Sequence, residues 1–252
     1  MIDYPQLRSH AERYLTLSTE PLQVTLVLRA NSHLAGYDPL NLDNLLARAV
    51  VDDATDGRRL PESQEPYSLP APIKCLWRSA EGLPLWAATP FYPVGRCESD
   101  VAYWHKRVQT GRWSGTKRGT FAIRSTNGRW MERRVPLPTR LAEAWAAECV
   151  GNAEEIGRLL RRFAHVGKRR SNGFGEVREW RIKPIERFTL LREDKLTRAI
   201  PALALLDLGI IGLPEGTAAP VGWTPPQWKP SLFLPGWWPG TPVRPYDFFE
   251  AP

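Results

Sequence analysis

The sequence HVGKRRSNGFGEV, residues 165–177, decides the fold because it joins a helical pattern to the last strand pattern of the chain. It combines three glycines with three adjacent cations, which are Gly167, Gly173, Gly175, Lys168, Arg169 and Arg170. Glycine permits positive φ and close approach of the backbone, and the cations carry charge that phosphates would neutralise. The stretch contains neither GxxxxGK[ST] nor GxGxxG, so it indicates no triphosphate or dinucleotide site. We interpret it as a glycine loop that either approaches a phosphate backbone or forms a solvated turn.

The patterns on both sides of the glycine loop predict a helix and a final strand. In residues 152–163, Asn152 and Glu155 resemble a capping box. One side of this helix is an apolar stripe and the other is basic, formed by Ile156, Leu159, Leu160 and Phe163 and by Arg158, Arg161 and Arg162. After the loop, residues 176–182, EVREWRI, alternate between polar and apolar side chains, which predicts a strand.

Further strands and a helix are predicted nearer the N-terminus. Residues 22–30, LQVTLVLRA, predict a buried strand, and Asn41 can cap a helix with apolar spacing at Leu42, Leu45, Leu46, Ala49 and Val50. Residues 83–92 predict a second strand, and residues 120–137 predict two strands joined at Asn127-Gly128. The order strand, helix, strand, strand, helix, strand is that of a ferredoxin-like (RRM-like) α+β domain, a fold that hosts many functions.

Two regions fall outside this pattern. Residues 93–119 are basic, glycine-bearing and too polar for a core, so we expect an excursion from the domain. After Pro184 the chain is rich in Pro, Gly and Trp, which predicts an irregular segment packed on its own domain or on a partner. Its apolar run, 199–213, is expected to be buried. We therefore expect a domain at 1–186, with an insertion at about 93–118, and a C-terminal extension at 187–252.

The composition favours a polyanionic partner. The net charge is +7 and the pI is about 9.5. The three cysteines are widely spaced without a CxxC pair, so we expect a reducing cytoplasm, no disulfide framework and no metal. No signal peptide or membrane span is indicated, and no cofactor motif is present.

The glycine loop, placed after a helix and before a final strand, resembles that of the RAMP superfamily, the ferredoxin-like RNA-binding subunits of CRISPR systems. HLAGYDPLNLDNLLARAVVDD, residues 33–53, is similar to the segment after the first strand in several of these proteins. With the Pro-rich ending, the chain most resembles the subunit of type IV CRISPR effector complexes that takes the place of the Cas-five family and caps the 5′ end of the guide RNA. The resemblance covers about residues 22–183.

This resemblance implies a non-catalytic, RNA-binding subunit of a ribonucleoprotein. The implied contacts to the 5′ handle of the CRISPR RNA are Arg162, His165, Lys168, Arg169, Arg170, Asn172, Gly173, Phe174 and Gly175. From their residue types alone, Phe174 could stack on a base or pack in the core, and Asn172 could contact a base or hold the turn. The excursion would be a thumb-like insertion against the guide and the adjoining Cas-seven-like backbone subunit, beside a large-subunit-like protein.

Basic and aromatic residues of the insertion suit nucleic-acid contact. Its expected nucleic-acid contacts are Lys106, Arg107, Arg112, Trp113, Lys117 and Arg118, and Tyr103 and Trp104 suit stacking or packing. Each of these cations is otherwise a solvated surface charge. Their charge alone motivates the further hypothesis that the insertion touches target DNA.

The rival function is a metal-independent, Cas-six-like endoribonuclease that processes precursor CRISPR RNA. Such an enzyme needs a base near neutral pKa, which histidine supplies. His33 follows the first strand, and Asp43 is a candidate to orient it; His105 with Lys106 is a second pair. His165, expected at the end of the second helix, suits capping or RNA contact. An RNA-binding or docking protein unrelated to RAMP subunits remains a third reading.

Overall fold

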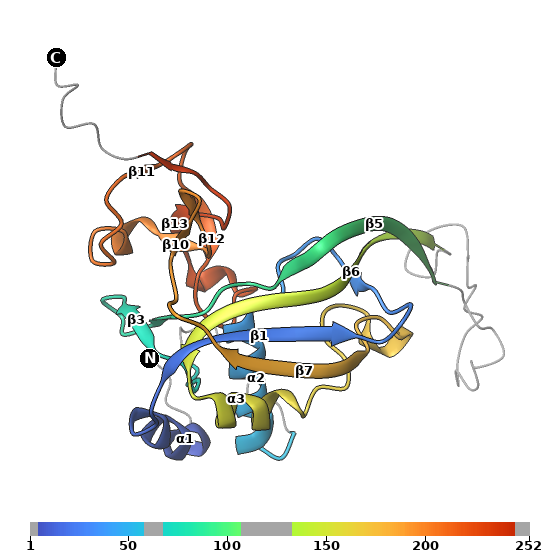
Figure 1. Ribbon diagram of the computed structural model, residues 1–252, viewed down its shortest axis with the longest axis horizontal. Helices are drawn as coiled ribbons and strands as arrows, with labels where there is room; N and C mark the ends of the chain where they lie inside the picture. Colours follow the sequence, from blue (N-terminus) through green and yellow to red (C-terminus); the bar gives the residue numbers. More distant parts are fainter. Residues whose placement is uncertain (1–4, 58–67, 107–132, 245–252) are drawn as a thin grey trace, which may run out of the picture.

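The computed structural model describes residues 5–57, 68–106 and 133–244. They form a mixed α+β structure with antiparallel sheets (Figure 1). The larger part contains α1 (Pro5–Leu15), β1 (Glu20–Leu28), β2 (Leu34–Ala35), α2 (Leu42–Ala54), β3 (Cys75–Arg78), β4 (Pro84–Trp86), β5 (Tyr92–Lys106), β6 (Arg133–Gly151), α3 (Ala153–Leu160) and β7 (Val177–Pro184). Among the described residues, no helix is long and apolar enough to cross a membrane.

The main sheet is centred on β1 and β6. Its order is β7-β1-β6-β5, with every neighbouring pair antiparallel, and β2 also pairs with β6. In β1, Leu22, Val24 and Leu26 are fully buried and alternate with partly exposed residues, as expected for a strand with one covered face. The three helices lie on the covered face (Figure 1), and the core also contains Leu42, Leu46, Val50, Ile156, Leu159 and Leu160.

The two predicted helices form, but their ends differ from expectation. The Asn152 side chain accepts a hydrogen bond from Glu155 N at 2.9 Å, so the predicted cap of α3 is confirmed. Asn41 precedes α2 with extended backbone, but its side chain makes no capping hydrogen bond, so that cap prediction was wrong. Helix α3 ends at Leu160, several residues before the predicted end.

The prediction of a strand at residues 83–92 was wrong for most of that range, because the corresponding strand of the sheet, β5, begins at Tyr92. Within residues 83–91, only Pro84–Trp86 forms a strand, β4, and it pairs with β3 outside the main sheet. β5 begins at Tyr92 and runs through the first half of the predicted insertion, paired with β6 along its length. Beyond β1 and β2, these two strands continue as a two-stranded ribbon (Figure 1). The predicted turn at Asn127-Gly128 lies outside the described residues.

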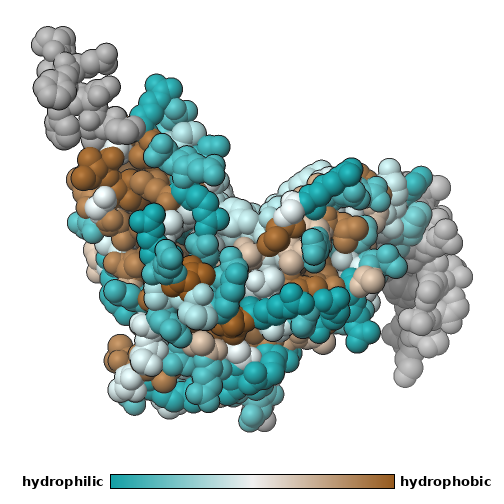
Figure 2. Space-filling model, in the orientation of Figure 1, coloured by the Kyte–Doolittle hydropathy of each residue, from teal (hydrophilic) through white to brown (hydrophobic). Residues whose placement is uncertain are grey.

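The C-terminal segment builds a second core. Its strands are β8 (Leu191–Arg192), β9 (Lys195–Leu196), β10 (Ile200–Pro201), β11 (Leu213–Pro214), β12 (Ala219–Gly222), β13 (Phe233–Trp237) and β14 (Val243–Arg244). Trp223 is fully buried there, beside Leu83 and Leu85. The prediction that residues 199–213 are core is only partly correct, because Leu206 is 82% exposed and Ile211 is 72% exposed. Figure 2 shows hydrophobic side chains gathered over the surface of this C-terminal part.

A buried arginine joins the two cores. Arg198 Nη2 lies 3.3 Å from Asp43 Oδ2 on α2 and donates to Trp223 O at 2.6 Å. The same guanidinium donates to Trp86 O and, at 3.0 Å, to Ala88 O. Burial raises the pKa of the Asp43 carboxyl above its usual range, and the charge of Arg198 opposes that rise. The C-terminal segment is thus attached to α2 by a hydrogen-bonded ion pair.

Candidate nucleic-acid interface

The glycine loop is closed at its base by backbone hydrogen bonds. Val166 N donates to Gly175 O at 2.8 Å, and Val177 N donates to Ala164 O at 2.9 Å. Gly175 N donates to His33 O at 2.9 Å, which ties the loop to the turn after β1. The loop is therefore a turn whose base is closed and is attached beside β1 by backbone hydrogen bonds.

Two of its glycines have different roles. Gly175 has φ of 65°, and a Cβ there would lie 1.9 Å from Val166 O, so only glycine fits. Gly173 also has positive φ, 84°, but a Cβ there would meet nothing within 4 Å. Gly175 is thus required by packing, whereas Gly173 is favoured by backbone conformation alone.

Ser32 is a buried support of the loop that the sequence analysis missed. Its hydroxyl accepts from Glu176 N at 2.8 Å and lies 3.3 Å from Gly173 O, to which it donates. Ser32 follows Asn31, which has φ of 65°. That Asn-Ser pair was a turn signal in the sequence, but its contact with a loop about 140 positions away depends on the tertiary fold.

The three loop cations have different partners. Lys168 forms an ion pair with Asp38, while the Arg169 guanidinium lies 4.3 Å from the centre of the Trp104 ring on β5. Arg170 has no carboxylate partner among the described residues. The stack on Trp104 brings the glycine loop and the β5–β6 ribbon together, so the predicted loop site and the start of the predicted insertion are neighbours.

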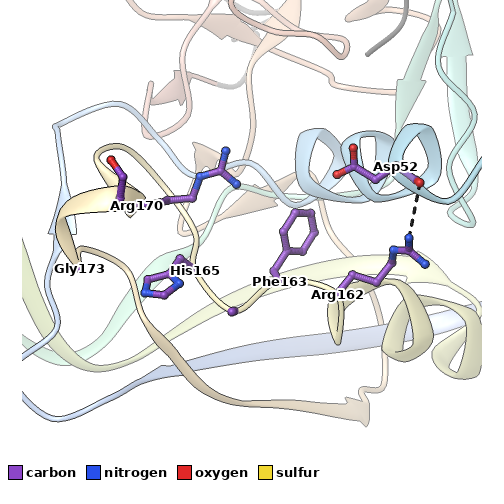
Figure 3. A pocket seen from close by; sticks show the side chains of 8 residues that line it. Asp52, Arg162, Phe163, His165, Arg170 and Gly173 are labelled. Atoms are coloured by element: carbon purple, nitrogen blue, oxygen red, sulfur yellow. Dashed lines mark hydrogen bonds between the residues drawn. The ribbon is translucent and has the colours of Figure 1, made fainter. Parts of the chain in front are cut away.

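A hollow of about 690 Å³ adjoins the loop, which we call the loop hollow. Its lining residues come from α2, the chain that follows α3 and the loop, and are Asp52, Arg162, Phe163, Ala164, His165, Arg170, Ser171 and Gly173. In Figure 3, Arg170 extends from the loop toward Phe163, and Arg162 reaches α2 on the far side. Arg162, His165, Arg170 and Gly173, all predicted from sequence, therefore meet in one place.

Arg162 is held by a carboxylate. Its Nη1 donates to Asp53 Oδ1 at 2.8 Å, and Arg158 Nη2 donates to Asp53 Oδ2 at 2.6 Å. The hydrogen bond from Arg158 lowers the pKa of the Asp53 carboxyl, which keeps it charged. The Arg162 guanidinium is therefore held in place at the loop hollow, and Asp53 compensates part of its charge. Arg170 has no such compensation among the described residues.

The remaining loop residues differ in exposure. Asn172 is exposed and Phe174 is half-buried outside the core cluster. The backbone of His165 pairs with that of Glu176 in an isolated antiparallel β-bridge, and His165 lies beyond the end of α3 at Leu160. The prediction that His165 lies at the end of the helix was therefore wrong, because α3 has already ended at Leu160.

His33 is not arranged as predicted for a nuclease. Its Nδ1 lies 3.4 Å from the hydroxyl of Thr139, while Asp43 is occupied by Arg198 and Gln227. The prediction that Asp43 orients His33 was wrong, because α2 places that carboxylate in the buried junction. His105 is exposed on β5.

The distal insertion lies outside the described residues. This applies to Arg107, Arg112, Trp113, Lys117, Arg118 and the side chain of Lys106. At the start of the ribbon, Arg134 on β6 stacks 3.7 Å from the centre of the Tyr103 ring on β5. In the described part of the chain, His, Cys, Asp and Glu form no cluster of three suited to a metal.

The fold and loop define an α+β protein whose antiparallel sheet presents a cationic glycine loop. A family model described as CRISPR type IV associated protein Csf3 matches residues 20–201, from β1 to β10. The chain belongs to the Csf3 family, which confirms the resemblance to type IV CRISPR proteins. No curated protein matches the sequence.

Proposed function

We propose that this chain is a non-catalytic RNA-binding subunit of a type IV CRISPR ribonucleoprotein and that its glycine loop holds the 5′ handle of the CRISPR RNA. Membership of the Csf3 family supports the CRISPR context. The observation that carries the RNA-binding role is the uncommitted guanidinium of Arg170 in the loop hollow, beside Arg169 on Trp104. A phosphodiester would supply the anion that Arg170 lacks among the described residues.

We infer that the main domain, residues 1–186, is a ferredoxin-like RAMP domain. The order β1-α2-β5-β6-α3-β7 and the sheet order β7-β1-β6-β5 support this assignment. The extension at 187–252 would then be an addition attached through Arg198. The fold itself carries no function, so the RNA-binding role rests on the loop and its hollow.

The ribbon is proposed to continue as a thumb-like insertion that contacts the guide and a Cas-seven-like backbone subunit, with a large-subunit-like protein nearby. Basic residues beyond it, including Lys117 and Arg118, are proposed to touch target DNA. Reversing both charges should weaken duplex capture by the assembled complex and leave guide binding unchanged. Equal loss of both activities would argue against the DNA contact.

The alternative, a metal-independent nuclease with His33 as base, has weaker support. The imidazole of His33 faces a hydroxyl, and Asp43 is engaged elsewhere. The test is to mix the protein with labelled CRISPR repeat RNA in EDTA and to run denaturing and native gels. A band shift without cleavage supports the binding subunit, whereas a discrete cut that His33→Ala abolishes would establish the nuclease.

A further inference from the structure

A second hollow, of about 760 Å³, lies between α3 and β7, and we call it the edge hollow. Residues of both elements and of the chain that leaves α3 form its walls, and these include Gly157, Arg161, Phe163, Ala164, Arg178 and Trp180. β7 pairs with β1 and ends the sheet on this side of the described structure. The edge hollow therefore runs along the open border of the sheet.

The edge hollow continues from the loop hollow. Both are lined by Phe163 and Ala164, where the chain passes from α3 into the glycine loop. Ala164 is exposed and has a small side chain, so an extended polymer can cross it from one hollow to the other. The two hollows thus form one track around the end of α3.

Each hollow contains an arginine with unused binding capacity. Within the described residues, Arg161 in the edge hollow and Arg170 in the loop hollow have no carboxylate partner. Arg178 shares the carboxylate of Glu179 with Arg181, at 2.8 and 2.5 Å. Glu154 and Glu179 also line the edge hollow, so its cationic feature is the unpartnered guanidinium of Arg161 and not an excess of positive charge.

Gly157 leaves space in the edge hollow that helix packing does not require. It lies inside α3, where alanine is the more favourable residue. A Cβ there would meet Ile182 Cδ1 at 3.5 Å and Arg161 Nη1 at 3.6 Å, which are ordinary contacts. An alanine would therefore fit at this position, whereas a larger side chain would project into the edge hollow.

We propose that the edge hollow binds the single-stranded RNA that continues from the glycine loop, an inference that rests on the proposed function. Arg161 and Arg178 contact its phosphates, and the partly exposed Trp180 faces its sugars and bases. The unpartnered guanidinium of Arg161 and the continuity with the loop hollow favour RNA over a peptide strand added to β7.

The test measures binding of the full-length protein to two single-stranded RNAs, of about 8 and about 16 nucleotides. Both carry the handle at the 5′ end, and the longer RNA continues beyond it. Arg161→Ala combined with Arg178→Ala should lower affinity for the longer RNA several-fold and flatten its log–log salt slope by about 1.4, about 0.7 per phosphate. Binding of the shorter RNA should not change. Arg244→Ala, an exposed arginine on β14, is the matched control.

A second pair of variants guards against misfolding. Gly157→Ala should raise the melting temperature, because it removes a helix-interior glycine, and should change RNA affinity little. Gly157→Leu should fill the hollow and weaken only the longer RNA. Unchanged affinity and slope for the longer RNA in both the arginine and leucine variants would overturn the proposal, and loss of co-purifying protein subunits instead would assign the hollow to a peptide.

The outcomes separate this inference from the proposed function. If Arg170→Ala weakens both RNAs while the edge-hollow variants bind as wild type, the loop site stands and the extended track does not. If the unmodified protein binds neither RNA, the proposed function itself fails.

Discussion

The guanidinium of Arg169 lies 4.3 Å from the centre of the Trp104 indole ring. Arg169 has φ of 55°, an uncommon backbone conformation for a residue with a side chain, and Trp104 lies on the neighbouring ribbon. This stack fixes one cation of the glycine loop against β5. It also predicts that the loop and the ribbon act on RNA as one unit.

A double-mutant cycle on RNA affinity tests that coupling. Arg169→Ala and Trp104→Ala should each weaken repeat-RNA binding, and the double variant should lose less than the sum of the two. We expect an interaction free energy of about 0.5–1 kcal/mol, as for an exposed cation–π pair. Additive losses would mean that the stack does not contribute to the bound state.

Gly175 and Gly173 form a matched pair for stability. Gly173→Ala meets no neighbour and should cost about 1 kcal/mol, because only its left-handed backbone opposes the substitution. Gly175→Ala adds a clash with Val166 O and should cost more than about 2 kcal/mol in urea unfolding. Equal losses for the two variants would contradict the closed-base geometry of the loop.

Arg198→Met should be among the most destabilising single substitutions. It leaves the buried Asp43 carboxylate without its guanidinium and several buried carbonyls without a donor, so we expect a loss of about 3–5 kcal/mol. Tryptophan fluorescence, which includes the buried Trp223, would follow the transition. Arg244→Met removes an exposed pair with Glu215 and should change stability by less than about 0.5 kcal/mol.

The Asp53 carboxylate predicts an acid-sensitive contact between α2 and α3. The pKa of Asp53 is lowered by its hydrogen bond from Arg158, so its stabilisation is complete above the unfolded pKa, about 3.9. That stabilisation is lost as pH falls through the lower, folded pKa. Asp53→Asn should therefore reduce stability at pH 7 and lessen its decline between about pH 5 and pH 2. A variant with the same acid profile as the wild-type protein would contradict this role.

Local patterns explain what the sequence could predict. β1, α2, α3, β7 and the glycine loop have strong periodicity, a cap or a glycine cluster within a few residues. β6 was missed between 139 and 151 because TRLAEAWAAECVG is rich in helix-forming Ala, Glu and Leu. It becomes a strand because β1 and β5 pair with its two edges, which is a non-local effect.

The same distinction applies to the site. The loop cations were visible as a run, but Ser32, Trp104 and Asp53 contact the site from distant parts of the chain. The buried role of Arg198 had no local signal either. Arg198 follows the charged stretch REDK at residues 192–195 and precedes the apolar run, so it resembles an ordinary surface charge.

The most direct test of RNA binding at the glycine loop is the salt dependence of repeat-RNA affinity for the Arg170→Ala variant. Affinity would be measured in EDTA between about 50 and about 200 mM salt, with Arg244→Ala as control. The account predicts weaker binding, a log–log slope flattened by about 0.7, and intact RNA on a denaturing gel. An unchanged affinity and slope, or RNA cleavage that depends on His33, would contradict it.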